Sequence, residues 1–116
     1  MRTSRQSSCI VSENSFRIDA GMESTGDVPF EWIERIEAYK RDELTTDLVC
    51  FDITYRMSEG KRIAWVHEEM PGFAQLNLAL QQRLPGLEAD WFSKVAQPAF
   101  AENRRTILMR SPNADE

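Results

Sequence analysis

The sequence predicts an α+β domain in which antiparallel strands are followed by one longer and one shorter helix. Apolar and polar residues alternate over residues 48–55 and 63–68, as in strands with one buried face. Residues 73–84 instead place apolar residues at helical spacing, between a Pro-Gly pair on each side. Strands that precede helices are typical of α+β proteins.

A chain of 116 residues fits one domain. Residues 1–14 and 111–116 are polar and lack apolar periodicity, so we expect both ends to be disordered tails. The globular domain is then expected over residues 15–110. The composition of the whole chain, 41% apolar and 28% charged, is that of a globular protein with one core.

The elements follow in order. "FRID" predicts a short strand, and "LVCFDITY" and "RIAWVH" predict two strands joined by a turn at Gly60. The longer helix carries its apolar residues on one face, and a short helix that buries Trp91, Phe92 and Val95 is expected to end at Pro98. "RRTILMR" predicts a final strand. In the strand over 48–55 the alternation predicts a core face and a solvent face. The core face is Val49, Phe51, Ile53 and Tyr55, and the solvent face includes Asp52 and Thr54.

The segment 30–43 allows two interpretations. Ile33, Ile36 and Leu44 recur at helical spacing among good helix formers, which favours a helix. Alternatively, a single turn leads into a strand, and "RDELTTD" is the tip of a hairpin.

The net charge of −5 argues against a non-specific nucleic-acid or anionic-membrane partner, because both require a basic field. The N-terminal residues lack the apolar stretch of a secretory signal, and no window is apolar enough to span a membrane. Cys9 and Cys50 make a poor disulfide framework and suggest reduced thiols. We therefore expect a cytoplasmic protein.

Three stretches, "VPFEWIERIEAYKRDELTTDLVCFDI", "VHEEMPGF" and "LPG" before "WFSKVAQPAFAENR", resemble a family of small uncharacterised bacterial proteins with pleckstrin-homology-like domains. The resemblance spans roughly residues 16–110. It implies a small antiparallel sheet or split barrel, and it favours the hairpin over the helix in segment 30–43. It implies no activity.

Catalytic and metal sites are poorly supported. Asp42, Glu43 and Asp47 lack the alternating acids, the Gly and the distal Glu of a calcium loop, and a solvated hairpin tip explains them better. The lone His67 has no second His at the spacing of a zinc helix, and neither Ser58, Ser93 nor Cys50 lies on a nucleophile elbow. We therefore predict no metal, no cofactor and no catalytic residue, with His67 at the surface or capping a turn.

Binding to a protein partner is better supported. The acids Asp42, Glu43 and Asp47 could speed encounter with a basic partner. Arg104 and Arg105, with Asn103 and Arg110, could contact an acidic partner, although pairing with the chain's own acids explains them as well. Aromatic residues could also form an interface. Of Trp32, Tyr39, Trp65 and Trp91, most are expected in the core.

These observations predict a non-enzymatic binding or regulatory module. An immunity or antitoxin-like inhibitor, a small acidic protein that masks a basic toxin site, is a specialised alternative. A small hydrolase that uses His67 is a third; it would require a concave pocket containing His67 and a second titratable group.

Overall fold

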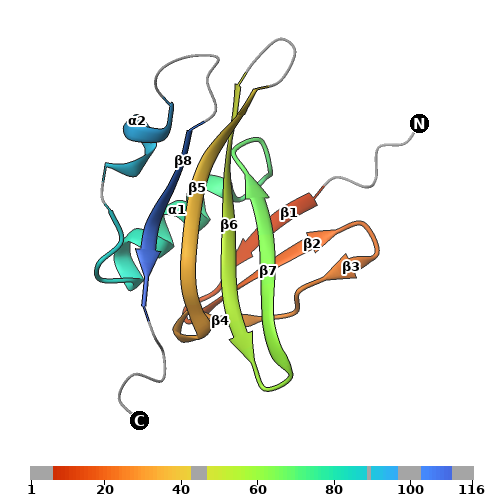
Figure 1. Cartoon of the computed structure of the whole chain (residues 1–116). Helices are drawn as coiled ribbons and strands as arrows, with labels where there is room; N and C mark the ends of the chain where they lie inside the picture. The colour runs from red at the N-terminus through yellow and green to blue at the C-terminus, as the bar shows by residue number, and fades with distance from the viewer. Residues whose placement is uncertain (1–6, 43–46, 89, 97–102, 111–116) are drawn as a thin grey trace, which may run out of the picture.

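The large sheet has four antiparallel strands in the order β7-β6-β5-β8 (Figure 1). Their bounds are β5 (Ile33–Asp42), β6 (Asp47–Met57), β7 (Gly60–His67) and β8 (Asn103–Met109). The computed structural model describes residues 7–42, 47–88, 90–96 and 103–110. β6 lies at the centre because its apolar residues on the inner face, flanked by β-branched and aromatic neighbours, suit a strand with a partner on each side.

The hairpin interpretation of segment 30–43 is confirmed. Asp42 pairs with Asp47 at the end of the β5–β6 ladder, and the helical part is a single 3-10 turn, η1 (Phe30–Trp32). The pairing with β6 shifts between Ile33 and Arg35, so Glu34 is a bulge. One extra residue in a strand reverses which of the following side chains face the core. Ile33 and Ile36 therefore both point into the core, and their three-residue spacing imitates a helix.

The small sheet contains β1 (Ser7–Val11), β2 (Ser15–Ala20) and β3 (Glu23–Ser24), and β4 (Val28–Pro29) also pairs with β2. The predicted strand at "FRID" is thus confirmed as part of β2. The predicted N-terminal tail was too long, since residues 7–14 form β1 and the turn into β2. Cys9 is buried opposite Ile18, and its N–H donates to the Pro71 carbonyl at 2.8 Å. Residues 1–6 and 111–116 lie outside the described residues.

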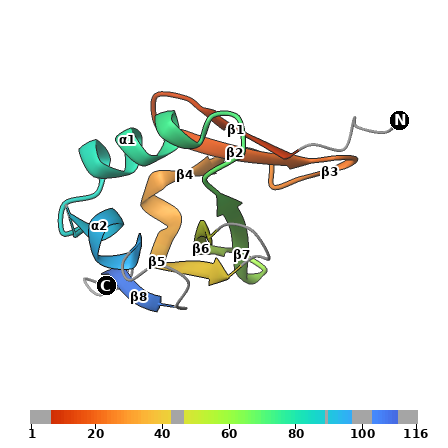
Figure 2. The same ribbon diagram turned by 90° about the horizontal axis from the view of Figure 1, so that it is seen from above.

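The small sheet and α1 (Phe73–Arg83) together cover the inner face of the large sheet (Figure 2). α2 (Trp91–Ala96) contacts β5 and β8. The layers meet at Phe51, whose ring centroid lies 5.3 Å from that of Phe73 and 4.7 Å from that of Trp91. Buried residues of both sheets and both helices belong to one hydrophobic cluster.

α1 starts and stops near the predicted residues, and α2 lies in the predicted segment. Leu76 and Leu80 of α1 are fully buried, and Gly72, with φ of 89°, precedes the helix. The prediction for α2 was correct for Trp91 and Val95 but wrong for Phe92, which is 42% exposed. Pro98, the predicted end of that helix, lies outside the described residues.

The predicted fold class, however, is wrong. Strands account for 55% of the described residues, and they form two antiparallel sheets rather than one small sheet or split barrel beside helices. The error has a physical cause. The strands of the small sheet are short and polar on one side, so they resemble turns and tails in the sequence. No helix in the described part of the chain is long and apolar enough to cross a membrane.

Candidate binding surface at the β7 edge

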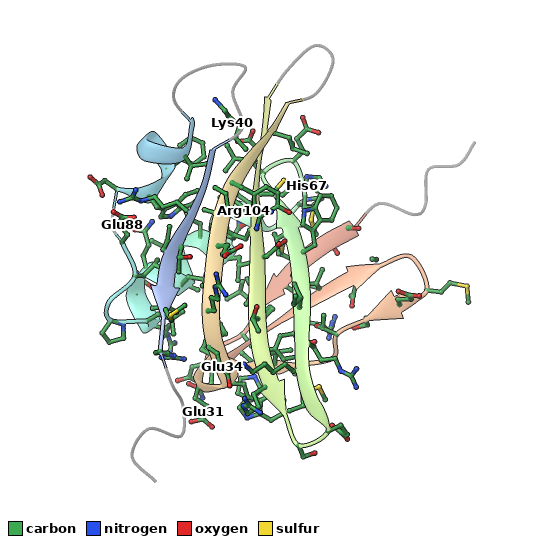
Figure 3. The ribbon with its side chains drawn as sticks, in the orientation of Figure 1. Glu31, Glu34, Lys40, His67, Glu88 and Arg104 are labelled. Atoms are coloured by element: carbon green, nitrogen blue, oxygen red, sulfur yellow. The ribbon has the colours of Figure 1, made fainter. Side chains whose placement is uncertain are left out.

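The basic residues near the C-terminus separate in the structure. Arg104 points from the outer face of the large sheet, which faces the viewer in Figure 3, and pairs with Glu37 and Asp52. Arg105 instead makes two hydrogen bonds to the Glu88 carboxylate, at 2.6 and 2.7 Å. Arg110 donates to the carbonyls of Ile33 and Phe30, at 2.7 Å each, and so holds η1. Arg104 and Arg105 therefore pair with acidic residues of the same chain, which is the alternative that the sequence left open for this cluster.

The predicted acidic tip is described only in part. Asp42 and Asp47 lie opposite one another where β5 ends and β6 begins, which is the position that the hairpin prediction requires. Glu43 lies outside the described residues.

The outer face carries a polar and aromatic cluster. The register places Arg104, Tyr39, Cys50 and His67 in one row across the four strands. The Arg104 guanidinium carbon lies 4.0 Å from the Tyr39 ring centroid, and the Tyr39 hydroxyl donates to Asp52 at 3.0 Å. Burial, and next the hydrogen bond to Asp52, raise the pKa of Tyr39 to about 12. The phenol is protonated at neutral pH, as an ordinary Tyr is, and its hydroxyl donates to Asp52.

His67 has a local structural role. Its Nδ1 accepts a hydrogen bond from the Glu69 N–H at 3.2 Å, which closes the turn after β7. Its ring packs beside Trp65, with centroids 4.9 Å apart. The prediction of a capping His is confirmed. Cys50 is its cross-strand neighbour, but Cys50 is fully buried and its thiol donates to the Leu48 carbonyl at 3.6 Å.

A groove lies between the two sheets, with a volume of about 560 Å³. One wall is β7, with Arg62, Ala64 and Trp65. The opposite wall comes from the small sheet, and Ile18 contributes apolar surface there while Ala20 and Glu23 lie near its rim. Tyr55 and Met57 of β6 also line the groove, and polar residues of the small sheet and the turn after it, among them Ser24 and Thr25, do so as well.

The groove runs along an open sheet edge. Among the described strands, β7 pairs only with β6, whereas the opposite edge strand, β8, is in contact with α2. Ile63 and Trp65, on the outer side of β7, are 65% and 39% exposed. The β2–β3 hairpin, residues 15–24, extends past β7 on the inner-face side, and we call it the ledge (Figure 2). The site is thus a strand edge with a ledge beside it.

A second cavity, of about 320 Å³, lies between η1 and the end of α1. Arg83 and Glu31 line it, and Arg83 donates to the Asn14 side chain at 3.3 Å. His67 lines neither of these two cavities. The described residues contain no group of three or more His, Cys, Asp or Glu side chains placed to hold a metal ion.

No family model, curated protein or solved structure matches this chain. The resemblance to a pleckstrin-homology-like family therefore stays a prediction.

The sequence reasoning missed the groove, although "IAWV" contained a signal for it. Ile63 and Trp65 face one way and Ala64 and Val66 face the other, so β7 is apolar on both sides. Such a strand is normally covered on both faces. Here it is an edge strand with an exposed outer face, which marks it as a candidate for contact with a partner. Only Trp91 of the four interface-capable aromatic residues is fully buried.

Proposed function

We propose that this protein is a non-enzymatic binding module that holds an extended segment of a protein partner along β7. The observation that carries this proposal is the groove of about 560 Å³ beside an open strand edge. An exposed edge presents unpaired backbone N–H and C=O groups, which an added strand can pair. Backbone pairing supplies affinity, and the pockets beside the edge supply specificity.

The apolar surface around the edge supports the same proposal. A strand added beside β7 directs alternate side chains to its two faces. On the outer face they meet Ile63 and Trp65, and on the inner face they enter the groove beside Ile18, Met57 and Ala64. Trp is among the residues most enriched at binding hot spots. Exposed apolar side chains of this size would gain from being covered by a partner.

The position of the ledge favours a partner that binds as a single extended strand over a partner that binds through a flat surface. Because the β2–β3 hairpin reaches past β7, it limits access to the edge from the inner-face side (Figure 2). A single extended strand fits between the ledge and β7, whereas a broad, flat surface would meet the ledge first. We therefore favour a linear segment of a protein over a folded surface.

A hydrolase is less well supported. Hydrolysis by His67 would require a concave site that contains His67 and a second titratable group. His67 instead caps a turn outside both described cavities. The groove contains Glu23 and the hydroxyls of Ser24 and Thr25, but the hydrogen bonds described for these two hydroxyls are to backbone groups, not to a general base.

The proposal is tested by filling the groove. Ala20 is exposed at its rim, so Ala20→Trp adds bulk inside the groove without disturbing the core. Ala74 is exposed on α1 and does not line the groove, and Ala74→Trp is the matched control. Random extended peptides displayed on phage are selected on the wild-type protein, and the selected peptides are then titrated into 15N-labelled protein.

The expected result is that selected peptides shift and protect the amides of β7, that Ala20→Trp abolishes the shifts, and that Ala74→Trp keeps them. Circular dichroism checks that both variants fold. If no peptide sequence is enriched, or if the enriched peptides shift amides away from β7 and the ledge, the proposal is wrong.

A further inference from the structure

Arg62 differs from the basic residues next to it. It lies on the inner side of β7 opposite Tyr55, is exposed, and lines the groove. Arg56 and Lys61 both bind the Glu34 carboxylate, at 2.5 and 3.1 Å, but Arg62 has no ion-pair partner within the described ranges. The groove is lined by both polar and apolar residues. A guanidinium at its wall is well suited to bind a carboxylate, because it offers two parallel donors.

The charges along the β7 edge run from basic to acidic. Lys61 and Arg62 stand near its first residue, and Glu68 and Glu69 follow its last. A strand that binds here is stabilised when its own charges run the opposite way. Its negative end then lies beside Arg62, and the acids after β7 repel a carboxylate at the other end.

The direction of the bound strand follows from the sheet. All pairings in the large sheet are antiparallel, and an antiparallel ladder is slightly more stable per residue than a parallel one. In an antiparallel complex, the C-terminal end of the bound segment lies beside the N-terminal end of β7, where Arg62 is located. From Arg62 to His67 the edge offers about 17 Å, enough for about five residues at roughly 3.4 Å each.

From these observations we infer that the groove selects an extended apolar segment of about five residues whose C-terminal end carries a carboxylate, which Arg62 binds. This inference rests on the proposed function. The carboxylate belongs either to an Asp or Glu side chain or to the C-terminus of the partner, because both offer the same pair of oxygens. Glu23 on the opposite wall disfavours a carboxylate placed near the ledge, and so keeps it on the β7 side.

The test uses three peptides with the same alternating Thr and Val core, which differ only at the last position. One ends in Asp-amide, one in Asn-amide, and one in Val with a free carboxylate. Each is titrated by NMR up to millimolar concentration into the wild-type protein, Arg62→Gln and Lys61→Gln. Lys61→Gln is the matched control, since it removes the same charge one residue away, on the outer face where Lys61 binds Glu34.

We expect the wild-type protein to bind the Asp-amide peptide about five- to tenfold more tightly than the Asn-amide peptide. Arg62→Gln should remove this preference, and Lys61→Gln should keep it. A preference of the free-acid peptide over the Asn-amide peptide identifies a terminal carboxylate as the natural source, and its absence identifies a side chain.

Two results overturn the inference while leaving the proposed function intact. One is equal binding of the Asp-amide and Asn-amide peptides at the β7 edge. The other is a preference that survives Arg62→Gln. If none of the three peptides shifts any β7 amide, then strand addition itself fails for this class of peptide and the inference falls with it. The phage selection then decides independently whether the groove binds another class.

Discussion

Phe51 connects the layers of the protein, because it contacts both Phe73 of α1 and Trp91 of α2 from the centre of β6. Its side chain is fully buried, and the other predicted core residues of this strand are buried as well. Asp52 and Thr54 face outward and are partly exposed. The predicted orientation of β6 is therefore confirmed.

Replacement of Phe51 by Ala should lower the free energy of unfolding by about 3–5 kcal/mol, because it removes buried apolar surface and leaves a cavity between three elements. Thr54→Ala, on the outward face of the same strand, should change it by no more than about 0.5 kcal/mol. Denaturant unfolding followed by fluorescence measures both values. A loss below about 1 kcal/mol for Phe51→Ala would contradict the packing described for this residue.

Glu34 is a largely buried carboxylate at the bulge of β5, at the opposite end of the large sheet from His67 (Figure 3). The hydrogen bond from Arg56 lowers the pKa of Glu34 below its ordinary value of 4.5, against the opposing effect of burial. A lowered pKa in the folded state stabilises the protein above the ordinary pKa, and this stabilisation disappears as the pH falls through the lowered value.

We therefore expect Glu34→Gln to be less stable than the wild-type protein at pH 7. The difference should shrink as the pH falls below about 4.5, since the wild-type carboxylate then becomes protonated as well. Urea unfolding of both proteins from pH 7 to pH 2 measures this convergence. A difference that stays constant over that range would mean that the ion pairs of Glu34 with Arg56 and Lys61 do not stabilise the fold.

At the scale of elements, the start of α1 is fixed by a close approach to β1. A Cβ atom on Gly72 would lie 2.0 Å from the Cys9 carbonyl oxygen, and the φ of 89° is itself unfavourable for other residues. Gly26 has a similar φ of 70°, but a Cβ there would meet no atom within 4 Å. Substitutions at Gly26 and Gly72 therefore separate the free-energy cost of the left-handed backbone conformation from the cost of the steric contact with Cys9.

Gly26→Ala should destabilise the protein by roughly 1 kcal/mol, which is the cost of a left-handed conformation for a residue with a Cβ. Gly72→Ala should cost clearly more, because β1 and α1 must also move apart. Thermal unfolding of the two variants compares them. Equal melting temperatures would show that the contact between Gly72 and Cys9 relaxes without cost.

The tip of the β5–β6 hairpin remains a predicted contact for a basic partner. Replacing Asp42, Glu43 and Asp47 by Asn, Gln and Asn should slow association and weaken its dependence on salt, because long-range attraction is lost. Lys40 and Arg41 reduce the acidic field, so the effect should be modest. Stability should change by no more than about 0.5 kcal/mol.

The matched control changes the same net charge elsewhere, at Glu13, Glu31 and Glu59, which are exposed in turns away from the tip. Association rates with a basic partner, measured by stopped flow at low and high salt, compare the two triple variants. Equal rates for both variants at both salt concentrations would move the contact away from the tip.

At the scale of the whole molecule, the sequence was sufficient for the elements with long and regular patterns. The β6–β7 hairpin and α1 were predicted because each has a sustained apolar face. The small sheet was not, since β3 and β4 have two residues each and depend on β2 for their existence. The bulge at Glu34 places Ile33 and Ile36 on the same side of β5, and this spacing made segment 30–43 resemble a helix in the sequence.

The candidate site was harder to predict than the fold, because the groove joins residues that are far apart in the chain. Ile18 and Ala64 meet across it only when the small sheet covers the large one. Single-residue reasoning about Arg104 and Arg105 left both alternatives open, and their pairing with Glu37 and Glu88 depended on strand order and on the loop before α2. Neither the strand order nor the position of this loop could be predicted from the local sequence pattern.

Folding should not require a metal ion. Metal sites in proteins need several ligands held together, and buried residues of both sheets and both helices already form one hydrophobic cluster. Addition of EDTA should leave the melting temperature unchanged. A rise of several degrees with micromolar calcium, magnesium or zinc would contradict this prediction, and would direct attention to Asp42, Glu43 and Asp47.

The ledge has a consequence for self-association. An apolar edge strand such as β7 can pair with the same strand of a second copy of the chain, and continuous sheets form in this way. In a closed antiparallel pair the two copies are related by a two-fold axis perpendicular to the sheet, so both ledges would project over the junction from the same side and collide. We therefore expect the hairpin beside the groove to hinder sheet extension between two copies, while the β7 edge stays accessible to a single extended segment.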